Sequence, residues 1–306
     1  MASGPTNVTP APIVAPRKRF HYRLFNGEVR GRRGHIHWTI VTIVMWTLAL
    51  LFLMPFVWMV VSSLKREIDV FRLPIRWIPD PLTWKNYIEI WTGRYPITNF
   101  IGNSLLVALV RVVGELLTAS LAAYAFSRLK FRGRDIVFVL YLSTLIIPHQ
   151  MLLVPRFILY RQLGIFDTLW ALILPGIFTV FGTFLLRQFF LSIPQELTDA
   201  ARSDGANELQ IYWQIILPLA KPALASLAIL AFVWSWNDYE TPLVMLTSED
   251  KFTVPLGLTR YFDESGGFSA ALISAGAVSS VIPIFAVFLI LQRQFIAALA
   301  RSGLKG

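Results

Sequence analysis

The chain has 306 residues, of which 55% are apolar and only 15% are charged, and its net charge is +10. Soluble domains usually carry about 25% charged residues, so this deficit favours a protein that lies partly in lipid. The absence of cysteine excludes disulfides and thiolate metal sites, and four scattered histidines argue against structural zinc. The basic excess fits anionic membrane lipid better than nucleic acid, because the long apolar runs leave little soluble surface.

Six apolar segments are long enough to cross a membrane, since a span needs about 20 mostly apolar residues. Four of them contain no Asp, Glu, Lys or Arg, whereas the second and the fifth carry two such residues each. The predicted spans are 38–64, 98–127, 136–155, 168–186, 222–246 and 268–292. We therefore predict an all-α membrane protein with six transmembrane helices.

The segments that flank the spans predict how the chain is oriented. Residues 1–36 are expected to form a basic and partly disordered tail, because residues 1–16 are rich in Pro, Ala and Thr. The first apolar run is too long for a signal peptide and should be retained. With the N-terminus inside, the inner segments hold 17 Lys and Arg and the outer ones 10. Both termini are thus predicted in the cytoplasm, around a six-span domain at 37–297 and a C-terminal tail at 298–306.

The polar loop at 192–218, between the fourth and fifth spans, is predicted to form two short helices. Ser192 with Gln195 fits a capping box, and so does Asn207 with Gln210. Between the two helices, Gly205 can take a positive φ and end the first one. A helix–Gly–helix unit on the cytoplasmic side suits docking to a partner protein. The alternative, a helix lying on lipid, would show a sustained apolar face with Lys and Arg opposite.

The residues predicted to dock are small or acidic, or shape the two helices. Small side chains let the first helix sit deep in a groove, and the acidic ones can pair with Arg on a partner. They are Glu196, Asp199, Ala200, Ala201, Asp204, Gly205, Ala206 and Pro218. Pro218 is expected to end the second helix.

This loop resembles the EAA loop of ABC importer permeases. The family pattern is Glu-Ala-Ala, three residues, Gly, nine residues and then Ile-x-Leu-Pro. The chain has Asp-Ala-Ala at 199–201, Gly205, and Ile-x-Leu-Pro at 215–218, so that Asp replaces the family's Glu. The resemblance implies that this loop couples the permease to an ATPase subunit.

Further segments are similar to the MalG-like branch of carbohydrate-uptake permeases. They are Asn-Ser-Leu at 103–105, Ala-Ala-Tyr-Ala-Phe at 122–126, the basic turn at 128–134 and Phe-Val-Trp-Ser-Trp-Asn-Asp at 232–238. The resemblance covers residues 36–306. It implies a subunit that moves a disaccharide, an oligosaccharide or a glycerol-phosphate-type solute into a bacterial or archaeal cytoplasm by alternating access.

The same resemblance implies the partners. They are a second, MalF-like permease, a dimer of ATP-binding-cassette ATPases and an extracytoplasmic solute-binding protein, all in or at the cytoplasmic membrane. The sequence has no P-loop pattern, so ATP and Mg²⁺ are expected on the partner ATPase. We expect no catalytic residue and no metal site in this chain.

Polar residues inside the spans are costly in lipid and are therefore candidates for function. Arg111 and Glu115 lie four residues apart, so they can pair on one helix face or serve the transport pathway. Aromatic rings and polar groups in the fifth span suit the apolar faces and hydroxyls of sugars. These pathway candidates are Trp234, Trp236, Asn237, Asp238, Tyr239 and Glu240. Asn237 is the first choice for a sugar hydroxyl, and an interfacial aromatic belt is the alternative.

Two other classes of function remain open. An ATP-independent secondary transporter would need coupling-ion sites and often has internal repeats, neither of which is evident. A membrane-embedded enzyme should carry a metal or nucleophile motif near the interface. Neither class requires the helix–Gly–helix loop at 192–218.

Overall fold

The computed structural model describes residues 32–261 and 269–303, and every regular element within them is helical. The chain divides into two units, Met1–Pro55 and Phe56–Gly306. The boundary lies within the first helix, α1 (Arg32–Ser63). The last residues of the predicted N-terminal tail are therefore helical, while residues 1–31 lie outside the described residues.

Among the residues that the structure describes, four helical stretches are long and apolar enough to cross a membrane. They are Trp38–Ser63, Ile97–Arg128, Trp170–Leu191 and Ala270–Ile290. Two bent helix pairs raise the number to six if each pair is counted as one span. The chain thus has the predicted all-α membrane architecture. Its longest helices are α1, α4 (Ile97–Arg128) and α15 (Ala270–Gly303), and they correspond to the first, second and sixth predicted spans.

The third predicted span is broken. Helix α5 (Arg134–Ser143) and helix α6 (Leu153–Gln162) belong to two segments that meet at 90°. Between them, Ile147 is extended, with φ −77° and ψ 113°, and it precedes Pro148. The proline ring disfavours a helical conformation at the residue before it, which explains the break.

The fourth and fifth spans are interrupted as well. Helix α7 (Trp170–Ile177) and helix α8 (Val180–Leu191) are separated by an extended Phe178. Helix α12 (Lys221–Trp236) ends ten residues before the predicted end of the fifth span, and α13 (Glu240–Met245) follows a short turn. The predicted end at 246 was therefore wrong for a single helix. At its start, α12 meets the preceding segment at 77°.

The remaining helices are short. They are α2 (Glu67–Val70), α3 (Lys85–Thr92), α9 (Gln195–Ser203), α10 (Glu208–Ile211), α11 (Leu217–Leu219) and α14 (Val254–Gly257). Helix α15 continues to Gly303, so most of the predicted C-terminal tail is helical. Residues 304–306 lie outside the described residues.

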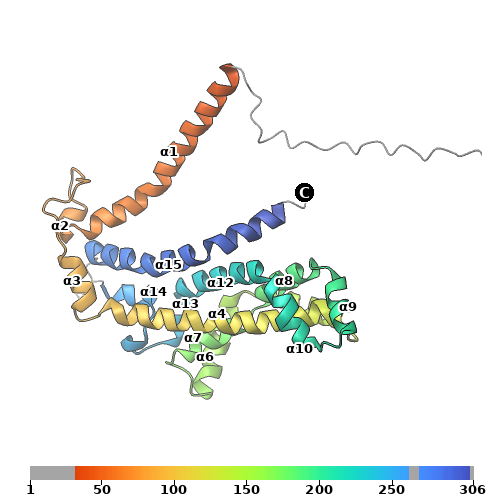
Figure 1. Cartoon of the computed structure of the whole chain (residues 1–306). Helices are drawn as coiled ribbons and strands as arrows, with labels where there is room; N and C mark the ends of the chain where they lie inside the picture. Colours follow the sequence, from red (N-terminus) through yellow and green to blue (C-terminus); the bar gives the residue numbers. More distant parts are fainter. Residues whose placement is uncertain (1–31, 262–268, 304–306) are drawn as a thin grey trace, which may run out of the picture. The chain divides into compact units, whose positions relative to one another are not determined.

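Helix α4 organises the second unit. Its 32 residues span about 48 Å, and in Figure 1 it runs from α3 at one end to α9 and α10 at the other. Its first half joins one apolar core with α7, α14 and the end of α12, and its second half joins another core with α8, α10 and the start of α12. Helix α10 thus packs at the same core as the second half of α4, and Ala201 of α9 lies at the edge of that core.

The end of α4 farthest from α9 is tied to the segment that follows α13. Asn103 donates from its side-chain nitrogen to the carbonyl oxygens of Asp250 and Phe252, at 2.7 and 3.0 Å. The backbone N–H of Val254 donates to the Ser104 hydroxyl at 2.8 Å. This end of α4 is thus fixed by hydrogen bonds to a segment 147 to 150 residues away in sequence.

Candidate functional site

The loop at 192–218 folds as two helical segments separated by a glycine. Helix α9 ends at Ser203, and Gly205 has φ +86°, as predicted. No atom lies within 4 Å of the position that a Cβ would take at Gly205. The glycine is therefore required by the left-handed backbone conformation and not by crowding.

One of the two predicted capping boxes is confirmed. Asn207 accepts from the Gln210 backbone N–H, and the Gln210 side chain accepts from the Asn207 N–H, both at 2.8 Å. The Ser192–Gln195 box was wrong. The Ser192 hydroxyl bonds back to the Phe189 carbonyl, and α9 begins after Pro194 with no side-chain cap.

The second segment changes its winding before it ends. Tyr212–Ile216 is π-helical, and α11 carries the chain past Pro218 to Leu219, one residue beyond the predicted end. Pro218 has no N–H for the carbonyl four residues earlier, so an α-helical ladder cannot continue through it undisturbed.

The residues predicted to dock lie mainly on α9 and in the turn that follows it. Glu196, Asp199 and Ala200 are exposed, as are Asp204 and Gly205 in the turn that follows. Ala201 and Ala206 are half-buried against the core, and Pro218 is exposed at the other end of the loop. The loop therefore presents a small, acidic face to its surroundings.

Arg128 fixes the start of this loop. It is buried at the end of α4, and its guanidinium donates to the Gln195 side-chain oxygen at 2.8 Å and to the carbonyls of Phe190 and Ile193. The planar fork of Arg suits several acceptors at once. One side chain thus ties α4 to the junction of α8 and α9.

A second set of contacts fixes the middle of the loop. Arg202 donates to Glu208 and to Asp199, both at 2.8 Å, and the Tyr124 hydroxyl donates to Glu208. The side-chain hydrogen bond with Glu208 is the main reason why the pKa of Arg202 is raised, so this residue stays charged. Asp199 therefore already has a partner within its own helix.

Polar residues of α4 lie between its two apolar cores and meet the break between α7 and α8. The Thr118 hydroxyl donates to the Ile177 carbonyl, and the Thr179 hydroxyl donates to Glu115 at 2.5 Å. Thr179 also accepts from the Gly182 N–H and so caps α8. These contacts satisfy backbone groups that the interrupted helix leaves unpaired, which matters most in lipid. We call this set, together with Arg111 and Asp238, the polar belt.

The predicted ion pair between Arg111 and Glu115 was wrong. Arg111 lies 3.4 Å from Asp238, and Glu115 bonds to Thr179. Asp238 can reach Arg111 because α12 has already ended at Trp236, and its other oxygen accepts from the Thr241 N–H, in the first turn of α13. A Cβ at Gly176 would lie 1.8 Å from the Arg111 Nε atom, so a larger residue there would force the guanidinium to move.

The six predicted pathway residues do not line one surface. Trp236 is buried and stacks on Phe232, whereas Trp234, Asn237, Tyr239 and Glu240 are exposed. The Asn237 amide donates to the carbonyl of Val233 at 2.9 Å, and Glu240 accepts from Gln150 at 3.2 Å. Of the six, only Asp238 joins the polar belt.

Sequence reasoning missed Thr179 and the structural role of Arg128. Thr179 follows Pro175 within an apolar run. The available signal was a hydroxyl residue shortly after a proline, where a helix can be interrupted. Arg128 was counted only as a positive charge on the inner side. Its burial depends on acceptors more than 60 residues away, which no local pattern shows.

Comparison with known proteins identifies the family. The family model described as binding-protein-dependent transport system inner membrane component matches residues 115–301. The arabinooligosaccharides transport system permease protein AraQ of Halalkalibacterium halodurans is 38% identical over 261 residues, which cover 85% of this chain and 93% of the relative. The sn-glycerol-3-phosphate transport system permease protein UgpE of Yersinia enterocolitica is 32% identical, covering 90% and 99%.

Solved structures agree with this assignment. A chain from a bacterial ABC transporter involved in the import of the acidic polysaccharide alginate matches with a TM-score of 0.77 and 27% identity, over 87% of this chain and 98% of that one. A second alginate transporter chain, solved with a pentasaccharide-bound periplasmic protein, shares the fold with a TM-score of 0.62 and 14% identity. These relatives favour an importer permease over a secondary transporter. The chain therefore belongs to the binding-protein-dependent transport system inner membrane components and is a multi-pass permease subunit of an ABC importer.

Proposed function

We propose that this permease subunit moves a neutral disaccharide or oligosaccharide into the cytoplasm by alternating access, driven by a separate ATPase. The observation that carries the proposal is the exposed, acidic face of α9 on a loop that Arg128 fixes to α4. A partner that grips α9 would move α4, which reaches the opposite end of the second unit. ATP would favour one of two states by binding its closed form more tightly.

The docking surface consists of the exposed residues of the loop and of the half-buried alanines beneath them. Small side chains allow a partner to approach closely, and the negative charges of Glu196, Asp199 and Asp204 favour a groove lined by Arg or Lys. Because Asp199 is already paired with Arg202, the partner would meet this pair together. ATP and Mg²⁺ would be bound and used by the partner, not by this chain.

The polar belt supports a solute pathway beside the interrupted helices. Interrupted spans supply free backbone groups and are common at transport sites. The exposed residues Trp234, Asn237 and Tyr239 lie next to the belt in sequence and offer aromatic and amide groups for sugar rings and hydroxyls. Asn237 remains the first candidate for a hydroxyl contact.

The charge of the belt bears on the solute. Its cation, Arg111, is already paired with Asp238. This pairing favours an uncharged sugar over a phosphate ester, since an anionic solute would have to displace a carboxylate. Glycerol phosphate is the second candidate, because UgpE is named for that solute. Competition between a labelled oligosaccharide and glycerol phosphate for uptake distinguishes the two.

We propose a complete importer with four kinds of component. Besides this chain they are a second permease, a pair of ATPase subunits and an extracytoplasmic solute-binding protein. A cytoplasmic location of both termini is supported by the excess of Lys and Arg in the segments that would then lie inside, with the chain surrounded by lipid of a bacterial or archaeal cytoplasmic membrane. We do not propose nucleic acid as a partner.

A matched pair of glycine variants tests the docking surface. Gly205→Val forces a β-branched residue into φ +86°, which should distort the α9–α10 turn and uncouple ATP hydrolysis from uptake. Gly164→Val is the control, because Gly164 has φ +71° and open space but lies between α6 and α7. In the reconstituted importer, we expect Gly205→Val to abolish solute-stimulated ATPase activity and uptake, and Gly164→Val to retain both. Normal coupling in Gly205→Val would refute the docking model.

A further inference from the structure

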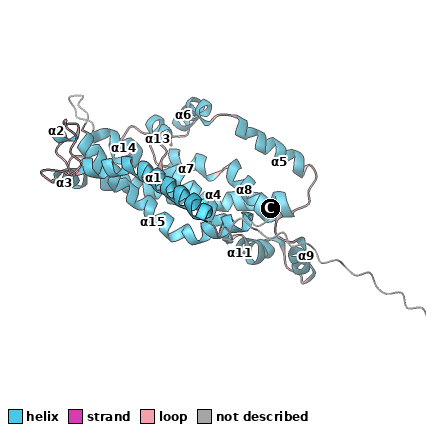
Figure 2. Ribbon diagram, turned by 90° about the horizontal axis from the view of Figure 1, so that it is seen from above, coloured by secondary structure: helices cyan, strands magenta, loops and turns pink. Residues whose placement is uncertain are grey.

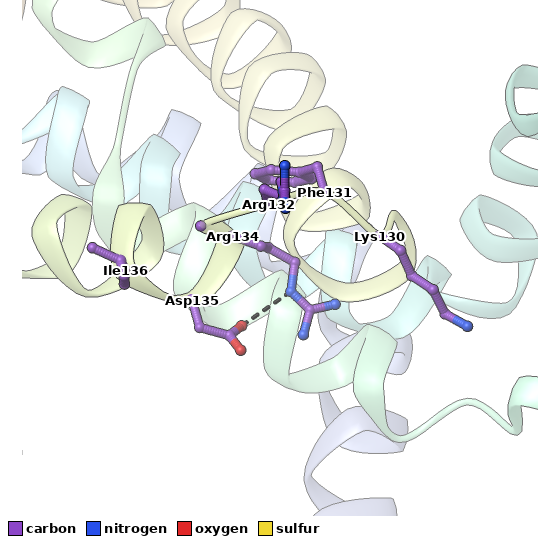
Figure 3. Close-up of a pocket in the computed structure, with 7 residues that line it drawn as sticks. Lys130, Phe131, Arg132, Arg134, Asp135 and Ile136 are labelled. Atoms are coloured by element: carbon purple, nitrogen blue, oxygen red, sulfur yellow. Dashed lines mark hydrogen bonds and ion pairs between the residues drawn. The ribbon is translucent and has the colours of Figure 1, made fainter.

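A basic turn joins α4 to α5. Its residues 130–134 hold Lys130, Arg132 and Arg134 around an exposed Phe131, and residues 130–136 line an open pocket (Figure 3). Gly133 has φ +79°, which lets the chain reverse direction within a few residues. Because the turn connects two segments that can cross a membrane, it lies at the membrane surface.

Two of its three cations have no partner in the described parts of the chain. Arg134 lies 3.0 Å from Asp135 and also donates to the Leu129 carbonyl, as Figure 3 shows for the ion pair. Lys130 and Arg132 are exposed and form no ion pair or hydrogen bond within those parts. The turn therefore carries an unneutralised positive charge directed to the solvent or to a ligand.

An apolar surface begins where the basic turn ends. Ile136, Val139 and Leu140 on α5 are 69%, 63% and 62% exposed, and Val137 is exposed too. In Figure 2, α5 lies at the edge of the second unit. A ligand that fits both surfaces must have an anionic end next to a long apolar part.

We propose that the basic turn 130–134 binds the phosphate headgroup of an anionic phospholipid, whose acyl chains lie along α5. A phospholipid has both parts in the required order, whereas a soluble protein partner would leave the apolar side of α5 uncovered. Charge complementarity distinguishes an anionic lipid from a zwitterionic one, because Lys and Arg near a membrane surface attract anionic headgroups. With the proposed orientation, the site faces the inner leaflet. The inference does not depend on which solute is transported.

The absence of cysteine makes a direct test simple. Ile136→Cys gives this chain a single attachment point for a bimane fluorophore, and any cysteines of the partner subunits are replaced before the importer is assembled in phosphatidylcholine nanodiscs. A minor share of the lipid is replaced by acyl-brominated phosphatidylglycerol or, separately, by acyl-brominated phosphatidylcholine. We expect phosphatidylglycerol to quench the bimane more strongly at equal content.

Charge variants assign that preference to the turn. Adding Arg132→Gln should weaken the relative affinity for phosphatidylglycerol about fivefold, as expected for one cation at an anionic surface, and adding Lys130→Gln and Arg134→Gln should abolish the preference. The control is the triple variant Arg72→Gln, Arg76→Gln, Lys85→Gln, which removes the same amount of charge from the predicted outer loop. This variant should retain the preference for phosphatidylglycerol.

Four results would overturn the proposal. Equal quenching by the two lipids before any charge is removed would show that the site does not select anionic lipid. A preference that survives the triple variant would place the selection elsewhere. Loss of the preference on adding inorganic phosphate would indicate a soluble-anion site. Loss of ATPase subunits from the triple variant, without any lipid preference in its parent, would assign the turn to protein docking.

Discussion

Single residues in the polar belt have partners that depend on breaks in the helices. Arg111 lies 3.4 Å from Asp238, which follows the end of α12 at Trp236, and its guanidinium occupies the space that a side chain at Gly176 would need. A charge within an apolar span is costly unless it is paired, so each partner requires the other. This interdependence can be measured without knowledge of the solute.

Asp238→Asn should lower the free energy of unfolding by about 2 kcal/mol, because it leaves Arg111 without its counter-charge. The double variant Arg111→Met, Asp238→Asn should lose less than the sum of the two single losses. Thermal unfolding in detergent provides the comparison, with Glu240→Gln as a control at an exposed neighbour. Strictly additive losses would mean that the pair does not interact.

Asp167 should make stability depend on pH. It lies between α6 and α7 at φ +55°, and its carboxylate accepts from Ser248, Thr247 and Lys251. Burial alone would raise its pKa, but these hydrogen bonds outweigh burial and hold the pKa of Asp167 well below its usual value.

A carboxylate whose pKa is lower in the folded state stabilises the fold above its unfolded pKa, about 3.9 for Asp, and loses this effect as pH falls through the folded value. We therefore expect the Tm of the wild type to fall more steeply below about pH 4 than that of Asp167→Asn, with a higher wild-type Tm at neutral pH. Asn tolerates the positive φ, so the backbone is not strained. Parallel curves over the whole range would contradict this role of Asp167.

At the level of elements, the sequence predicted long helices well and interruptions poorly. Helices α1, α4 and α15 lie within a few residues of their predicted spans or extend beyond them. An apolar run of 20 residues, however, looks the same whether or not it is broken. The Ile147–Pro148 break had a clear local signal, the proline that follows Ile147. The turn at 237–239 brings Asp238 to Arg111, a contact between two helical regions that spacing within one helix does not show.

The two candidate sites also differ in how well the sequence predicted them. In the helix–Gly–helix loop, the Asn207–Gln210 capping box and the positive φ of Gly205 were predicted correctly because both are local signals, whereas the Ser192–Gln195 box was wrong. The intramembrane site was predicted from composition alone, and the structure separates Trp236 from its exposed neighbours. Partner choices across helices, such as Thr179 for Glu115, cannot be derived from spacing within one helix.

Arg128 tests the link between the loop and α4. Arg128→Gln removes the charge and most of the fork, and should lower the free energy of unfolding by about 2 kcal/mol while raising hydrogen exchange in α9. Arg128→Lys should restore little, because an ammonium cannot reproduce the fork. Lys221→Gln, at the exposed far end of the loop, is the matched control. Unchanged hydrogen exchange in α9 would show that the hydrogen bonds of Arg128 do not anchor α9.

At the level of the whole molecule, α4 connects the proposed docking surface at one end to the 250–254 segment at the other. Each half of α4 packs in an apolar core, and the polar belt lies between the two cores. A long helix packed along its whole length suits alternating access, in which a movement driven on one side of the membrane opens the other side.

The most direct test of this account is solute uptake into proteoliposomes that hold the complete importer, with ATP trapped inside or left out. We predict that a labelled oligosaccharide accumulates only with internal ATP and the solute-binding protein outside, and that Gly205→Val abolishes this accumulation while Gly164→Val does not. Uptake by this chain alone without ATP would contradict the account and indicate a secondary transporter.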